Sequence, residues 1–158
     1  MSEHVSLSEI FPNEAHDFTP WLAKQKLLLH DICNDTVEVF RREMPIKKYF
    51  MDLTLKSSTN TFFIIENQYG EANHDHLGKC ILYAVLTHAE KVFWIAEEFL
   101  PEHEQIIREL PIQLVLVQLT VQKKNTEEYI LNIDIEEKEK SRHHRYTLNK
   151  EKQCSKIF

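Results

Sequence analysis

Residues 47–68, KKYFMDLTLKSSTNTFFIIENQ, predict two strands joined by a short turn. The two flanks, residues 47–55 and 61–68, are rich in aromatic and aliphatic side chains, which favour β-strands. The polar residues KSSTN at 56–60 form a turn between them. Because this connection is so short, the sequence predicts that the two strands lie next to each other in a sheet.

Each of these two strands carries a carboxylate among apolar residues. Asp52 stands in the middle of the first strand, and Glu66 stands near the end of the second strand, with Gln68 on the same face. An isolated carboxylate in an apolar strand is costly unless it is paired or bound to a cation. Two such carboxylates within a few ångströms repel each other, and a hard divalent cation relieves the repulsion; oxygen ligands without clustered cysteines favour Mg²⁺ or Mn²⁺ over zinc. The alternative is that each carboxylate pairs with a basic side chain or lies at a frayed strand end.

Further elements are expected on both sides of this pair. Thr19-Pro20 is typical of a helix start and predicts a helix at residues 20–33, whereas residues 36–43 predict a strand that ends at the Met44-Pro45 break. Beyond Gly70, strands are expected at 91–96, 112–122 and 129–135, and helices at 74–88 and 101–110. The helix at 74–88 is expected to bury one face, formed by Leu77, Ile81, Ala84, Val85 and His88. This order predicts an α/β fold with a mixed central sheet flanked by helices.

The length and composition predict one domain over residues 1–158. The sequence shows no membrane-spanning run and no secretory leader, so we expect a soluble, cytoplasmic protein. The net charge of −6 argues against indiscriminate coating of nucleic acid. Residues 138–157 nevertheless carry seven Lys or Arg and two Glu, a local charge of +5. This basic segment at residues 138–158 is either a phosphate-contacting element or a flexible, solvated tail.

Four blocks of sequence point to a known fold. They are FPNEAHDFTPWL at residues 11–22, the strand of Asp52, IIENQYGEANHDHLGKCILYA at residues 64–84, and VFWIAEEFLPEH at residues 92–103. Together they resemble the PD-(D/E)XK nuclease superfamily, and within it an uncharacterised group of bacterial and archaeal domains. The resemblance spans roughly residues 7–120 and implies a restriction-endonuclease-like core in the order αβββαβ.

Carried over residue by residue, the resemblance implies that Asp52 and Glu66 bind the metal and that Glu14 helps to complete the site. A surface or capping role for Glu14 is the alternative. The superfamily usually has Lys at the position of Gln68, and Gln can only orient a water or a charge through its dipole. Lys79 stands where related sequences tend to carry Gln, so it either supplies the cation missing at Gln68, contacts a phosphate, or is an ordinary solvated lysine.

On the helix expected at residues 74–88, the spacing of His76, Lys79 and Tyr83 predicts that they share one stripe, and the resemblance implies that this stripe lies beside the active site and faces nucleic acid. The resemblance therefore implies a Mg²⁺- or Mn²⁺-dependent nuclease acting on DNA, with RNA as the alternative substrate. A homodimer is expected if both strands of a duplex are cut. The alternative function is an inactive nuclease-fold module that binds nucleic acid or a partner protein, for instance in defence or repair.

Overall fold

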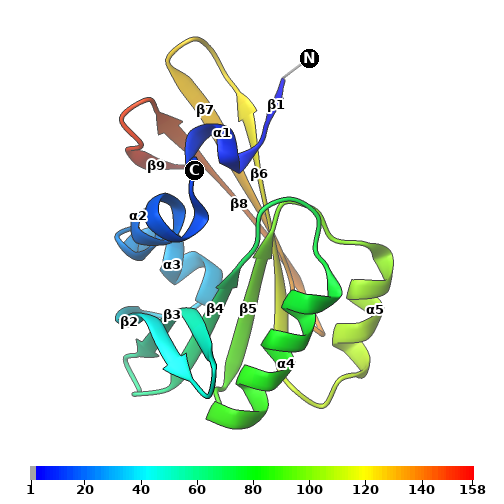
Figure 1. Cartoon of the computed structure of the whole chain (residues 1–158). Coiled ribbons are helices and arrows are strands. Elements are labelled where there is room, and N and C mark those ends of the chain that lie inside the picture. Colours follow the sequence, from blue (N-terminus) through cyan, green and yellow to red (C-terminus); the bar gives the residue numbers. More distant parts are fainter. Residues whose placement is uncertain (1–2) are drawn as a thin grey trace.

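A nine-stranded mixed sheet runs through the molecule, which is a computed structural model that describes residues 3–158 (Figure 1). The strands follow the order β2-β3-β4-β5-β6-β7-β8-β9, and β1 pairs with β6 beside this path. Their bounds are β1 His4–Val5, β2 Val37–Ile46, β3 Tyr49–Ser57, β4 Phe62–Asn67, β5 Lys91–Ala96, β6 Leu114–Lys123, β7 Glu128–Glu136, β8 Ser141–Asn149 and β9 Cys154–Ile157.

Strands β4, β5 and β6 are parallel, and the other pairings are antiparallel. Parallel neighbours need crossover connections, and here two helices supply them: α4 (His74–Thr87) joins β4 to β5, and α5 (Pro101–Glu109) joins β5 to β6. The predicted α/β fold with a mixed sheet flanked by helices is confirmed.

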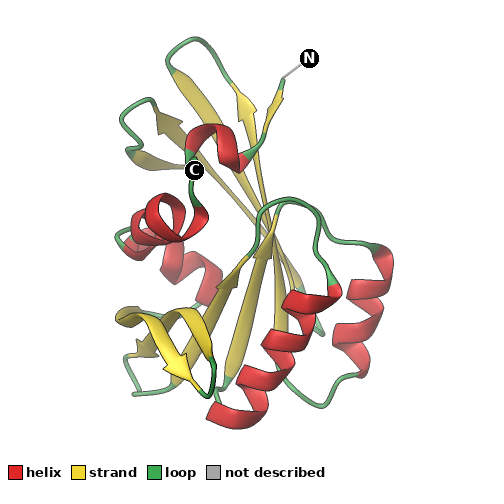
Figure 2. Cartoon of the chain, in the orientation of Figure 1, coloured by secondary structure: helices red, strands yellow, loops and turns green. Residues whose placement is uncertain are grey.

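The remaining helical segments precede β2 and lie together in space, apart from α4 and α5 (Figure 2). They are α1 (Leu7–Ile10), a π-helical turn η1 (Glu14–Phe18), α2 (Thr19–Ala23) and α3 (Lys26–Cys33). The helix predicted at residues 20–33 is thus divided between α2 and α3. Gln25 takes a non-helical conformation at this junction, with φ −92° and ψ 78°.

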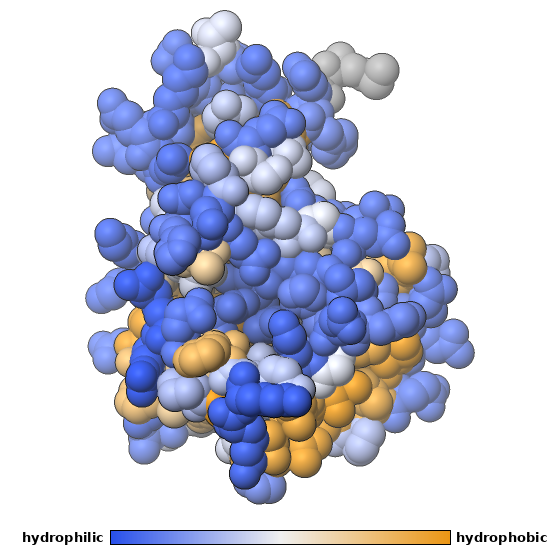
Figure 3. All heavy atoms as spheres, in the orientation of Figure 1, coloured by the Kyte–Doolittle hydropathy of each residue, from blue (hydrophilic) through white to orange (hydrophobic). Residues whose placement is uncertain are grey.

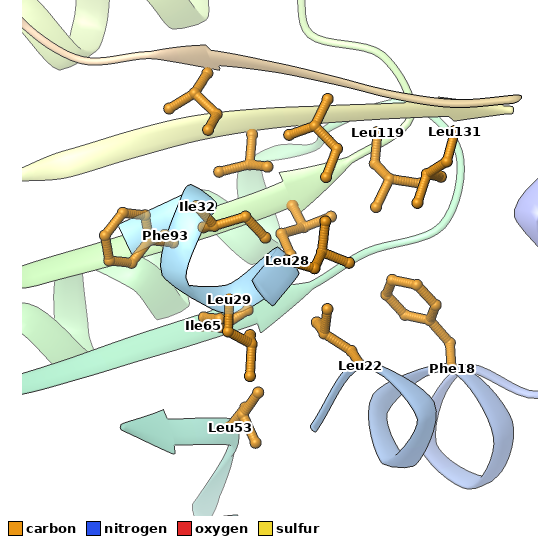
Figure 4. Packing of buried hydrophobic residues seen from close by; sticks show 14 of the residues in the cluster. Phe18, Leu22, Leu28, Leu29, Ile32, Leu53, Ile65, Phe93, Leu119 and Leu131 are labelled. Carbon is orange, nitrogen blue, oxygen red and sulfur yellow. The ribbon is translucent and has the colours of Figure 1, made fainter. Parts of the chain in front are cut away.

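The buried apolar residues form two clusters. One lies between the N-terminal helices and the sheet, where Phe18, Leu22 and Leu28 approach side chains of several strands (Figure 4). The other lies beneath α4 and α5 and includes the fully buried Trp94, as the apolar strand KVFWIA predicted. Burying large aromatic and aliphatic side chains on both faces supplies the main driving force for folding.

The face that α4 buries differs from the expectation. Cys80, Tyr83 and Ala84 point into the core, whereas Val85 is 56% exposed. The predicted burial is confirmed for Ala84, and Leu77 packs against the core, but the prediction was wrong for Val85 and His88, which are exposed. Apolar residues surround almost the whole second half of this helix, so the sequence period does not select one face. Leu86 of α4 is exposed as well. Figure 3 shows a broad apolar area on the face of the molecule that carries α4.

Strand β2 continues through the expected break at Met44-Pro45 and ends at Ile46. Proline is tolerated because β2 is the edge strand, where one row of backbone groups faces no neighbouring strand. The irregularity of this strand lies elsewhere, at a register shift between Val39 and Arg41. The hairpin of β2 and β3 therefore extends as one ribbon to the turn at Lys47 and Lys48.

The basic C-terminal segment is part of the sheet. It forms β8 and β9, and Arg142 of β8 donates to the backbone carbonyls of Asp31 and Ile32 at the end of α3. Tyr146 also donates to the Asp31 carboxylate. The segment is therefore an ordered part of the sheet, and contact of this segment with phosphate stays a prediction.

No helix within residues 3–158 is both long enough and apolar enough to cross a membrane.

Candidate functional site

The antiparallel pairing of β3 and β4 brings the two predicted carboxylates together. Leu53 pairs with Ile65, so the next positions outward, Asp52 and Glu66, stand opposite each other. The backbone N–H of Asn67 donates to Oδ2 of Asp52 at 2.8 Å. The short turn at residues 56–60 therefore does what the sequence predicts: it makes the strands neighbours and sets the two acidic groups side by side.

Glu66 is the most deeply buried of the acidic groups. It is 3% exposed, and its Oε1 has no hydrogen-bond partner among the described residues. Burial, together with the nearby charge of Asp52 and a hydrogen bond between the two carboxyls, raises the pKa of Glu66 well above its ordinary value. Burial likewise raises the pKa of Asp52, against the opposing effect of the Asn67 N–H.

Glu14 joins these residues from a different part of the chain. It begins the π-helical turn η1, a form of helix that is frequent at functional sites. Its Oε2 accepts a hydrogen bond from the backbone N–H of Tyr69 at 3.2 Å, just beyond the end of β4. Burial and the charge of Asp52 raise the pKa of Glu14 to about 7. The structure thus places Glu14 near Asp52 in a half-buried position.

Lys79 is the cation of this cluster. It lies in α4, and the charge of its ammonium lowers the pKa of Glu14, Asp52 and Glu66. Lys79 forms no ion pair within 4 Å among residues 3–158. It is close enough to influence the cluster and still available to another anion.

The amide of Gln68 is held by the protein itself. Its Oε1 accepts from the indole Nε1 of Trp94 at 3.1 Å and from the backbone N–H of Asn73 at 3.4 Å, and its Nε2 donates to the carbonyl of Glu71 at 2.7 Å. These bonds fix the loop that leads from β4 to α4. Both atoms of the Gln68 amide are therefore bonded to the protein, and a role for Gln68 in positioning a water stays a prediction.

The other two residues of the predicted stripe on α4 differ from each other. His76 is half-buried near the start of the helix, where its backbone N–H and its Nδ1 both contact Oδ1 of Asn73 at 3.0 Å. Tyr83 is completely buried, and its hydroxyl donates to the carbonyl of Phe50 at 3.2 Å. Contact of Tyr83 with nucleic acid is corrected accordingly: its ring belongs to the core, and its hydroxyl anchors the β2–β3 hairpin.

Two residues near the site were missed from the sequence. Asn67 is fully buried, and its Nδ2 donates to Oγ1 of Thr19 at 2.9 Å, which ties β4 to α2. The sequence does contain a signal for Asn67, because it is a polar residue between Glu66 and Gln68 in a strand that is otherwise apolar. Glu43 also raises the pKa of Asp52 and Glu14, but it lies in a polar edge strand where no sequence signal distinguishes it.

A divalent cation suits the donor set at this site. No three His, Cys, Asp or Glu side chains within residues 3–158 converge as a ready-made metal-binding group. Mg²⁺, however, is commonly held by only one or two carboxylates, with waters and substrate phosphates as its other ligands. The facing carboxyls of Asp52 and Glu66, one with an unpartnered buried oxygen, fit that mode of binding.

Comparisons with known proteins identify no family. No family description matches the sequence, and no curated protein matches it. Among solved structures, the fold is similar to a repair endonuclease from Pyrococcus abyssi, with 12% sequence identity and a TM-score of 0.47. The similarity covers 59% of this chain and 45% of that one. At this level the similarity assigns neither family nor activity, so a function has to be argued from the residues of the site.

Proposed function

We propose that this chain is a metal-dependent nuclease that hydrolyses phosphodiester bonds of DNA, with Asp52 and Glu66 as metal ligands and Glu14 beside them. The observation that carries the proposal is the buried carboxyl of Glu66, which faces Asp52 and leaves Oε1 without a partner among the described residues. Burying two adjacent carboxyls is costly, and a bound cation offsets the cost. The sequence resemblance to the PD-(D/E)XK superfamily supports the same assignment.

The residues of the chain have distinct parts in this scheme. Mg²⁺ or Mn²⁺ held by the two carboxylates would supply Lewis acidity to the scissile phosphate and acidify a water. The N–H of Asn67 orients Asp52. Lys79 presents a positive charge that offsets the negative charge developing on the phosphate in the transition state. Gln68 keeps the loop after β4 in place through Trp94 and Glu71.

The test is cleavage of labelled single-stranded, linear duplex and supercoiled DNA, and of RNA, with Mg²⁺, Mn²⁺ or EDTA. The decisive variant is Glu66→Gln, which keeps the shape of the side chain and removes its charge. The matched control is Glu109→Gln, which changes an exposed carboxyl at the end of α5. We expect cleavage that requires the metal, is lost in Glu66→Gln and is unchanged in Glu109→Gln. Cleavage that persists in EDTA, or in Glu66→Gln, would contradict the proposal.

A second candidate is a non-catalytic module that binds nucleic acid or a partner protein. The observation that favours it is the amide of Gln68, which is engaged by Trp94, Asn73 and Glu71 at the position where the superfamily usually has Lys. Absence of cleavage on every substrate, combined with nucleic-acid binding that survives Glu66→Gln, would make this module the better explanation.

A further inference from the structure

A groove of about 450 Å³ runs along the exposed side of α4, beside the end of the β2–β3 hairpin. Figure 1 shows this hairpin next to α4, and the Tyr83–Phe50 hydrogen bond connects the two elements. The volume lies within the roughly 300–1,000 Å³ that is typical of small-ligand sites. The groove is lined by Tyr49, His74, Asp75, Gly78, Lys79 and Leu82.

Gly78 leaves the floor of this groove open. Glycine in a helix interior costs about 1 kcal/mol relative to alanine, so it calls for a reason. Here the packing of the described chain supplies none, because a Cβ at position 78 would meet no atom within 4 Å. Without a side chain, the helix backbone is accessible to a flat group lying in the groove. Gly78 therefore leaves room in the groove that a side chain at this position would fill.

The wall opposite α4 is aromatic and basic. Tyr49 contributes a half-buried ring, and Nζ of Lys48 lies 5.7 Å from the centre of that ring. Lys47, in the same turn of the hairpin, is exposed. Neither Lys47 nor Lys48 forms an ion pair within 4 Å among residues 3–158. An aromatic ring beside unpaired basic groups is typical of surfaces that bind single-stranded nucleic acid.

Lys79 is the cation that lines the groove. The groove is also lined by Tyr49, which lies in the same strand as Asp52, three residues before it. Asp75 lies one helical turn away from Lys79 and repels phosphate from that end. A phosphate in the groove is therefore drawn toward Lys79.

From these observations we infer that the groove holds one unpaired nucleotide of the substrate, with its base against Tyr49 and over Gly78 and its phosphate directed to Lys79. A base inside a duplex has both faces stacked and its edge paired, so it cannot enter unless it is extruded. The substrate class is thus single-stranded or locally unpaired nucleic acid, either DNA or RNA. The inference rests on the proposed nuclease function, because that function makes a phosphodiester the group that reaches Asp52 and Glu66.

The experiment is fluorescence anisotropy in EDTA with a short labelled single-stranded DNA, an RNA of the same sequence and the corresponding duplex. The variants are Gly78→Leu, which fills the groove, and Tyr49→Leu, which removes the ring. Val85→Leu is the matched control, since it adds bulk at an exposed position of the same helix outside the groove. Gly78→Leu should fold, because leucine is a better helix former and its Cβ meets nothing.

We expect wild type to prefer the single strand over the duplex, and the DNA and RNA arms to show which sugar it prefers. Gly78→Leu should weaken single-strand binding about tenfold or more through steric exclusion. Tyr49→Leu should weaken it roughly 5- to 100-fold through lost stacking. Val85→Leu should bind like wild type. Equal or tighter binding of the duplex by wild type, or unchanged single-strand binding in Gly78→Leu, would overturn the inference.

The two proposals fail in different ways. If wild type cleaves nothing but Gly78→Leu still loses single-strand binding, the groove stands and the nuclease function falls. If metal-dependent cleavage is observed and Gly78→Leu binds and cleaves single strands like wild type, the nuclease function stands and the groove assignment falls.

Discussion

Nδ2 of Asn67 donates a hydrogen bond to Oγ1 of Thr19 at 2.9 Å, between two side chains that are almost completely buried. This bond joins the strand that carries Glu66 to the helix that follows Glu14. The backbone N–H of the same asparagine orients Asp52. Asn67 therefore positions groups that reach the candidate site from three separate parts of the chain.

The first prediction concerns this bond. Thr19→Val keeps the shape of the side chain but leaves Nδ2 of Asn67 without an acceptor, so we expect the free energy of unfolding to fall by about 1–3 kcal/mol. Urea denaturation measures the change. Thr126→Val, in an exposed turn, is the control and should be neutral. Equal stabilities for the two variants would show that the buried bond contributes nothing.

The second prediction concerns metal-free protein. Because burial and mutual repulsion disfavour the ionised forms of Glu66 and Asp52, Glu66→Gln should be at least as stable as wild type above neutral pH when EDTA is present. Adding Mg²⁺ should raise the melting temperature of wild type and not that of the variant. Thermal melts with and without metal test this, and an identical Mg²⁺ response in both proteins would exclude Glu66 as a ligand.

The third prediction distinguishes the three roles considered for Lys79. If the charge of Lys79 stabilises the transition state, Lys79→Met should lower kcat by roughly 100-fold, and Lys79→Arg should recover part of the loss. A phosphate contact would instead raise KM with kcat unchanged, and a solvated lysine would change neither. Steady-state cleavage kinetics separate these outcomes. Lys26→Met, an exposed position at the start of α3, serves as the control.

The fourth prediction concerns pH and the C-terminal strands. The carboxylate of Glu137 lies 2.7 Å from Lys91 and 3.3 Å from Arg142. Burial alone would raise the pKa of Glu137, but the hydrogen bond and charge of Lys91 and the charge of Arg142 outweigh it, so the pKa is lowered. A lowered pKa stabilises the fold above the ordinary value of 4.5, and this contribution is lost as the pH falls through the folded-state pKa.

Glu137→Gln should accordingly cost about 1–3 kcal/mol at neutral pH and progressively less in acid. Urea denaturation across the acid range measures the difference from wild type. The exposed neighbour Glu139→Gln is the control. A cost for Glu137→Gln that is the same in acid and at neutral pH would contradict the ion-pair explanation.

The sequence was sufficient for the strands that build the site. Residues 47–55 and 61–68 were predicted because they are short, apolar and joined by a polar turn, and that turn alone makes Asp52 and Glu66 neighbours. These properties are local, so they can be recognised without knowing how the rest of the chain folds. The apolar run around Trp94 was predicted as a buried strand for the same reason.

The basic C-terminal segment was ambiguous because the partners of its inward residues lie far away in the sequence. Along β8, Tyr146 and Leu148 are buried, and Arg142 is mostly shielded from solvent. Arg142 satisfies its charge on Glu137 and on carbonyls at the end of α3. Because Arg142 occupies an inward position of β8, the first half of this strand lacks the alternation of apolar and polar residues that predicts a strand. Its composition therefore resembles that of a solvated tail.

The α/β class, the β3–β4 pairing and the adjacency of Asp52 and Glu66 can be predicted from the amino-acid sequence, because hydrophobic period and turn length act over a few residues. The buried face of α4, the bond from Trp94 to Gln68 and the groove shared by Tyr49 and Gly78 are visible only in the folded molecule. Those outcomes depend on contacts between segments distant in sequence, where a single side chain has several energetically acceptable partners and packing of the whole molecule selects one.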